Sequence, residues 1–251
     1  MIEKINWKQI GSILLALIVY TVFINWKAAI LLVVAVGFHE QSHLLAAKYL
    51  GFKIKDFYLI PFVGGVAFIA DRYKYYWQNA FVAIMGPAGG ALLAGLTALA
   101  YLATGYAPLA AAAMFMCILN GFNLIFVSFL DGGQIMGTIT YSINKTFGMV
   151  CLVLSTVLGL LLMAKISIVL MVVIGFFGGM QTYNEVKNWW FDRKGQYWLV
   201  DDLWLNKPKA MSGKEIVVVI VSYLSLVSLL IGMMILLNKT PDSNFVEVLL
   251  K

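Results

Sequence analysis

The chain has 251 residues, of which 62% are hydrophobic and 12% are charged. Soluble globular domains have an apolar share nearer one half and about twice this charge, so the composition excludes an ordinary soluble domain. The net charge of +6 does not indicate nucleic-acid binding, because membrane proteins collect Lys and Arg on their cytoplasmic side. The sequence predicts an all-α polytopic membrane protein with about seven transmembrane helices.

The first transmembrane helix is expected within residues 1–27. Its apolar run ends near Asn25 and is bracketed by Trp7 and Trp26, as tryptophans collect at membrane–water interfaces. The basic start is also typical of a signal peptide, but no small-residue cleavage site follows the apolar run. We therefore expect this first span to be retained.

The second apolar segment, residues 28–50, carries His39, Glu40 and His43. Ionisable side chains inside such a segment are costly and are usually functional. Residues four apart share one face of a helix, so His39 and His43 can direct both imidazoles at one ion. Two imidazole ligands beside a carboxylate that accepts a proton from water are typical of zinc hydrolases. Because the chain has only two histidines, this spacing predicts a metal site rather than buried core histidines.

Residues 51–70 are expected to form a short strand or hairpin. Pro61 and several glycines interrupt aromatic and β-branched residues, a composition that suits strands better than helices. Irregular backbone inside a membrane is tolerated where it is buried in protein or lines a wet cavity. We therefore expect the segment to pack against the metal site and, around Gly64 and Gly65, to bind an extended substrate strand. A plain interfacial loop is the alternative.

A third span is expected over residues 80–104, where glycines and the Gly86-Pro87 pair would let helices approach closely. The Gly-Pro pair could also open this helix beside the active site. The packing role is the simpler interpretation of these glycines.

A fourth span is expected to begin near Pro108 and to end in NGFNLIFVSFLDGGQ, residues 120–134. Asp131 ends the apolar run, and the two glycines after it are expected to break the helix. A carboxylate there is the natural third zinc ligand and leaves a fourth position open for water. Asn123 lies slightly more than two helical turns earlier and could reach a bound peptide, or it could make an interhelical hydrogen bond. Asn120 is expected to be structural.

The C-terminal part begins with two apolar stretches in residues 147–182, split by Lys165. They predict a helical hairpin with Lys165 at its tip, and a single long helix is the alternative. The polar segment 183–214 mixes tryptophans with charges of both signs, which indicates a cytoplasmic interfacial loop that tethers the chain to the membrane surface. A lid over the active site is the alternative. A last span is expected at 215–237.

The expected organisation is an N-terminal helix in residues 1–27, a core in 28–146 and C-terminal helices in 147–251. A cytoplasmic N-terminus puts most of the Lys and Arg residues on the cytoplasmic side of seven spans, as the positive-inside rule requires. The second and fourth spans then both run inward, so the HExxH motif and Asp131 fall in the cytoplasmic half of a multi-pass cell-membrane protein.

Four stretches resemble the site-2 protease family of intramembrane zinc metalloproteases. They are HEQSH at 39–43, the glycine-rich PFVGGVAF after it, Gly86-Pro87, and NLIFVSFLDGG at 123–133. The resemblance covers about residues 28–146 and implies the family's three-helix catalytic core. Members of that family cut transmembrane segments of regulatory proteins, commonly tethered transcription factors, anti-sigma factors or pro-sigma factors.

The resemblance implies one zinc ion per chain and a role for each matching residue. The zinc ligands would be His39, His43 and Asp131. Glu40 would be the general base, and Asn123 would contact the substrate. The family usually has prolines between this Asn and the LDG motif, whereas this chain has Phe126 and Ser128 there, which predicts a more regular helix.

The sequence therefore predicts an intramembrane zinc metalloprotease that hydrolyses peptide bonds within or near transmembrane segments of regulatory membrane proteins. Its expected partners are the lipid bilayer and a membrane-protein substrate with a transmembrane helix, and not nucleic acid. A metal or proton transporter is one alternative, but its pathway would need ionisable residues at several depths in several spans. A catalytically inactive membrane scaffold is another alternative, and the retained Glu40 argues against it.

Overall fold

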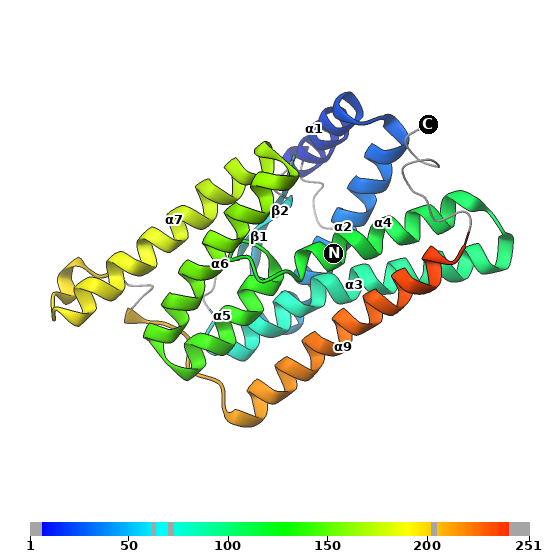
Figure 1. Ribbon diagram of the computed structural model, residues 1–251. Helices are drawn as coiled ribbons and strands as arrows, with labels where there is room; N and C mark the ends of the chain where they lie inside the picture. The colour runs from blue at the N-terminus through cyan, green and yellow to red at the C-terminus, as the bar shows by residue number, and fades with distance from the viewer. Residues whose placement is uncertain (1–6, 62–63, 70–72, 202–204, 241–251) are drawn as a thin grey trace. The chain divides into compact units, whose positions relative to one another are not determined.

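The computed structural model describes residues 7–61, 64–69, 73–201 and 205–240. These residues form helices and one two-stranded antiparallel sheet (Figure 1). In chain order the elements are α1 (Trp7–Phe23), α2 (Trp26–Tyr49), β1 (Ile54–Ile60), β2 (Gly64–Ile69), α3 (Tyr76–Thr104), α4 (Ala107–Asn123), α5 (Asp131–Ile143), α6 (Lys145–Ile166), α7 (Ile168–Arg193), the 3-10 helix η1 (Tyr197–Leu199) and α9 (Gly213–Asn238).

The chain divides into two compact units. The first unit comprises residues 1–71, 85–122 and 224–251, and the second comprises residues 72–84 and 123–223.

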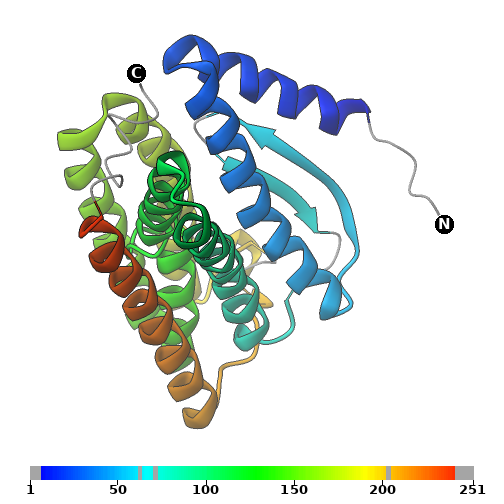
Figure 2. The same ribbon diagram turned by 90° about the vertical axis from the view of Figure 1, so that its right-hand side faces the viewer.

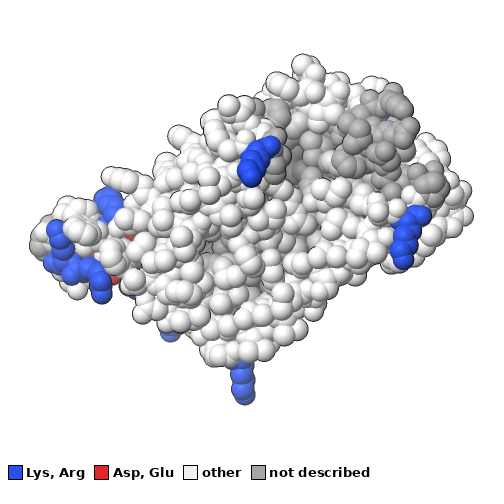
Figure 3. Space-filling view, viewed as in Figure 1, with Lys and Arg blue, Asp and Glu red and all other residues white. Residues whose placement is uncertain are grey.

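Four of the described helices, α2, α3, α6 and α9, are long and apolar enough to cross a membrane. Two further apolar helices, α1 and α4, have 17 residues each and are shorter than the roughly 20 residues that usually span a bilayer. On the face in Figure 3 most of the described surface is white, with a few Lys and Arg side chains and little Asp or Glu in view, as expected of a protein that contacts lipid. The structure supports a membrane protein with four candidate membrane-spanning helices among the described residues, and the expected count of seven spans stays a prediction.

The N-terminal helices and the hairpin pack together within the first unit. The turn between α1 and α2 is short because the Asn25 side chain caps α2, accepting a hydrogen bond of 2.9 Å from the Ala28 amide. The Leu59 amide of β1 donates to the Ser12 hydroxyl of α1 at 3.1 Å. Leu59 itself is buried in the core that α1 and α2 form. Figure 2 shows the hairpin lying alongside α2.

The predicted strand segment at 51–70 is confirmed as a hairpin. β1 and β2 pair antiparallel, with Ile60 opposite Gly64 and Leu59 opposite Gly65. Residues 62, 63 and 70 of the predicted segment lie outside the described residues.

The prediction of a helix that continues to Asp131 is wrong. α4 ends at Asn123, residues 124–130 are not helical, and Asp131 is the first residue of α5 instead of the last of a span. Gly132 and Gly133 therefore begin a helix and do not break one. A Cβ on Gly132 would collide with the main chain of Leu124, so the two glycines let residues 124–130 pack against the first turn of α5.

The absence of prolines at Phe126 and Ser128 does not make this stretch regular, because both side chains have partners elsewhere in the second unit. The Ser128 hydroxyl lies 2.9 Å from the Thr156 hydroxyl on α6. Phe126 stacks on Tyr223 with ring centroids 5.3 Å apart, and the Tyr223 hydroxyl donates to the Leu124 carbonyl at 2.7 Å. These contacts hold residues 124–130 in a non-helical path.

The predicted helical hairpin around Lys165 is confirmed. α6 ends at Ile166 and α7 begins at Ile168, with extended backbone at Ser167 between them (φ −159°). The two helices pack along each other (Figure 1). α7 continues to Arg193, so the first part of the segment expected to be a loop at 183–214 is helical.

The later part of that segment is held within the second unit by the half-buried side chain of Lys207. The Lys207 ammonium donates to the Glu185 carboxylate at 2.8 Å and lies 3.9 Å from the centroid of the Tyr141 ring. Burial lowers the pKa of Lys207, and the Glu185 carboxylate opposes that change. Burial, and then Glu185, raise the pKa of Tyr141, whose hydroxyl donates to Glu185 at 2.7 Å. The Tyr76 amide also donates to the Lys209 carbonyl at 3.1 Å.

Candidate metal site

The two histidines lie one turn apart on α2, as their spacing predicts. The Nε2 atoms of His39 and His43 are 3.1 Å apart, and the two rings meet edge to face. A tetrahedral zinc ion with zinc–nitrogen bonds of about 2.0–2.1 Å would separate two ligand nitrogens by about 3.3 Å. The pair is therefore spaced as two ligands of one ion. His39 is 3% exposed, and His43 is half-buried.

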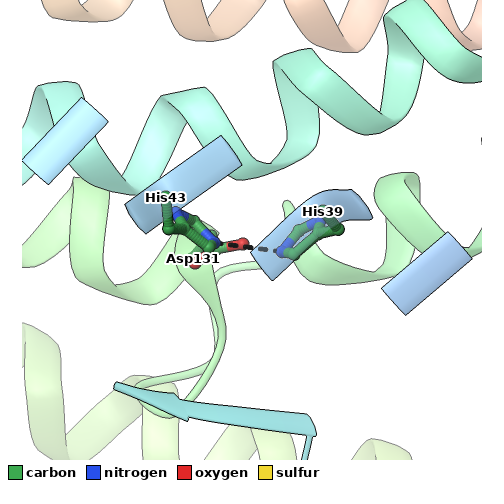
Figure 4. Close-up of side chains that lie close together, drawn as sticks. All are labelled: His39, His43 and Asp131. Carbon is green, nitrogen blue, oxygen red and sulfur yellow. Dashed lines mark hydrogen bonds between the residues drawn. The ribbon is translucent and has the colours of Figure 1, made fainter. Parts of the chain in front are cut away.

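Asp131, the first residue of α5, is the third residue of a group that could hold a metal ion. One ligand atom from each of His39, His43 and Asp131 lies within 4.8 Å of the other two (Figure 4). Two imidazole nitrogens and one carboxylate oxygen are ligands that catalytic zinc sites use, with a further position for water or substrate. The three residues form a group that could hold a metal ion, and their assignment as the ligand set stays a prediction.

Glu40, the predicted base, is positioned by the hairpin. The Gly65 amide of β2 donates to Glu40 Oε1 at 3.0 Å. Gly64 has a φ of +104°, in the region that favours glycine, and a Cβ there would lie 3.4 Å from the same carboxylate oxygen. The expectation that the hairpin packs against the site is confirmed at Glu40. Substrate binding by Gly64 and Gly65 stays a prediction.

Three glycines of α3 make room for polar side chains around the histidines. A Cβ on Gly86 would collide with the His43 imidazole, and a Cβ on Gly89 would collide with the Ser42 hydroxyl. A Cβ on Gly90 would collide with the Asn120 amide. The sequence predicted close helix packing from these glycines. The structure shows that the side chains of His43, Ser42 and Asn120 fill the space that these glycines leave.

Asn120 is a residue whose contact the sequence did not reveal. Its side-chain oxygen lies 2.8 Å from His39 Nδ1, and its side chain is 1% exposed. The signal in the sequence is an amide inside an apolar helix, from which only a structural role is predicted. Asn123, the predicted substrate contact, is the half-buried last residue of α4. Its role in binding substrate stays a prediction.

A comparison with protein families gives one match. Residues 27–107 match the family model described as Peptidase family M50, the site-2 protease family, which confirms the resemblance predicted from the motifs. The matched region contains His39, Glu40 and His43 and ends before Asp131. A search of the curated proteins gives no match.

Proposed function

From the match of residues 27–107 to Peptidase family M50, we propose that this protein is an intramembrane zinc metalloprotease. Its substrates would be regulatory membrane proteins, cut within or near a transmembrane helix. The observation that carries the proposal is the group of His39, His43 and Asp131, in a chain with four helices that could cross a membrane.

The three residues of the group, together with Glu40 and Gly65, each have a chemical role in the proposal. His39, His43 and Asp131 would hold one zinc ion per chain, which when bound lowers the pKa of water and polarises the peptide carbonyl. Glu40 accepts the proton that water gives up during attack and later delivers it to the leaving amine. The Gly65 amide keeps one Glu40 oxygen in place and so orients the carboxylate toward the reacting atoms.

The substrate must change shape before it can react. A transmembrane helix hides its carbonyl groups in internal hydrogen bonds, so the peptide must unwind locally before attack. The outer edge of the hairpin would replace the lost hydrogen bonds by pairing with the unwound strand, with Gly64 and Gly65 close to Glu40. Asn123 would contact the same peptide. The proposal also includes seven spans and a cytoplasmic N-terminus, supported by the distribution of Lys and Arg.

The transporter alternative has less support. Ion pathways distribute ionisable residues along the membrane. Among the described residues, one group of three or more His, Cys, Asp and Glu side chains could hold a metal, and it contains the HExxH histidines.

The test compares wild type with Glu40→Gln in detergent, using a synthetic transmembrane peptide of about 25 residues with glycines at its centre. Wild type should cleave the peptide, and the variant should keep its metal while losing about 10²- to 10⁴-fold in rate. Equal rates for the two proteins would refute the assigned base. If wild type retained no metal and did not cleave the peptide, the protease proposal would be refuted in favour of the transporter or the inactive scaffold.

A further inference from the structure

The contacts of the Asn120 amide determine which ring nitrogen of His39 carries a proton. The Asn120 Nδ2 group donates to the Met116 carbonyl at 2.7 Å, and a carbonyl oxygen can only accept. The oxygen of the amide therefore faces His39 Nδ1, at 2.8 Å. An amide oxygen also only accepts, so Nδ1 must be the protonated nitrogen of the ring.

This assignment places the lone pair of His39 where a metal would need it. A neutral imidazole has one N–H, so a proton on Nδ1 leaves Nε2 as the acceptor. That Nε2 atom is the one that lies 3.1 Å from His43 Nε2. A hydrogen bond from Nδ1 also fixes the rotation of a ligating ring and raises its basicity.

We propose that Asn120 is a positioning residue for the metal site, which holds His39 in the tautomer and orientation that present Nε2 to the ion. The inference rests on the proposed function, because it assumes that His39 binds a metal. It adds a residue that lies outside the matched part of the chain and outside the HExxH motif.

The surroundings of Asn120 favour this role over simple helix packing. A buried amide in an apolar helix is costly unless its polar atoms are paired, and both ends of this one make hydrogen bonds. Gly90 of α3 leaves the space that the amide fills, since a Cβ there would collide with it. An apolar residue at this position could pack α2 against α4 and so affect stability. It could not determine which nitrogen of His39 carries the proton, because it would make no hydrogen bond to the ring.

The first experiment reads the tautomer directly. Because the chain has only two histidines, protein labelled with ¹⁵N-histidine gives NMR signals from His39 and His43 alone. Spectra are recorded on metal-free protein in detergent, at a pH above the ordinary imidazole pKa. Wild type should show His39 with a protonated Nδ1. Asn120→Leu, which removes the acceptor at similar volume, should show a mixture of tautomers.

The second experiment measures zinc affinity by competition with a chelator. Loss of a hydrogen-bonding partner of a ligating histidine typically weakens metal binding by about 10- to 100-fold, and we expect this loss for Asn120→Leu. Asn120→Asp loses the donor to the Met116 carbonyl but keeps an acceptor toward Nδ1, so it should keep the Nδ1–H tautomer, which is the property it tests. Cys117→Ala, which shortens another fully buried side chain of α4, should change neither reading.

The outcomes separate this inference from the proposed function. If wild type binds zinc and Asn120→Leu binds it equally well, Asn120 does not position His39, although the metal site stands. If wild type binds no zinc, both the proposed metal site and the role of Asn120 are refuted. Should Asn120→Leu fail to fold, Asn120→Asp still decides, because a mixture of His39 tautomers in that variant would refute the inference.

Discussion

Glycines bring parts of the chain close together in both α3 and α5, but they make room for different atoms. In α3, Gly86 and Gly90 lie against side chains, the His43 imidazole and the Asn120 amide. In α5, Gly132 and Gly133 lie against the main chain of residues 124–130. A side chain can rotate away from an added methyl group, whereas a main-chain segment must move as a whole. The glycines of α3 should therefore affect the site, and those of α5 the fold.

The largest expected effect comes from removing Asp131 of α5, the third proposed zinc ligand. Asp131→Ala should lower the zinc content from about one ion per chain to near zero after a brief chelator wash, because two histidines alone seldom retain the ion. Metal analysis of detergent-purified protein measures this. Asp192→Ala, an acidic residue of α7 outside the group, is the control and should keep its zinc. Full retention of zinc by Asp131→Ala would mean that the three-ligand site is wrong.

The next effect concerns the fold around α5. In Gly133→Ala, the new methyl group would meet the Val127 carbonyl and the Ser128 Cα, so the loop must shift. We expect the free energy of unfolding to fall by about 1–3 kcal/mol or more, which tryptophan fluorescence during heating would detect.

Gly137 provides the matched control on the same helix. A Cβ at this position would meet nothing within 4 Å, so Gly137→Ala should leave stability unchanged or raise it by up to about 1 kcal/mol. If both alanine variants behave like wild type, residues 124–130 do not depend on the close approach that Gly133 allows.

The smallest effect is expected at α3. Gly86→Ala should push the His43 ring out of place and weaken zinc binding about tenfold, which corresponds to about 1.4 kcal/mol, with only a small change in unfolding temperature. Chelator competition and heating on one preparation measure both quantities. Gly95→Ala on the same helix meets only the flexible end of Met233, at 3.8 Å, and should bind zinc normally. A loss of stability in Gly86→Ala as large as that in Gly133→Ala would remove the contrast between the two helices.

The local parts of the site could be predicted from the sequence. His39 and His43 share a helical face because four residues make about one turn, and this spacing needs no knowledge of the rest of the chain. The hairpin at 51–70 was predicted from glycine, proline and β-branched residues, whose backbone preferences also act locally.

The break before Asp131 could not be predicted in the same way. Residues 124–130 contain neither glycine nor proline, and an apolar run of this kind suits a helix. Their path depends on partners distant in sequence, such as Thr156 for Ser128 and Tyr223 for Phe126. The role of Asn120 was missed for the same reason, because its contact with His39 joins residues 81 positions apart.

The hydrogen bond from the Gly65 amide to Glu40 suggests a route to selective inhibitors. A compound that binds the metal would meet the same kind of ligands in every enzyme with an HExxH motif. A compound wedged between β2 and α2 would instead break the bond to Glu40 and misalign the carboxylate while leaving the ion in place. Its selectivity would come from contacts with β2, which lie outside the HExxH motif.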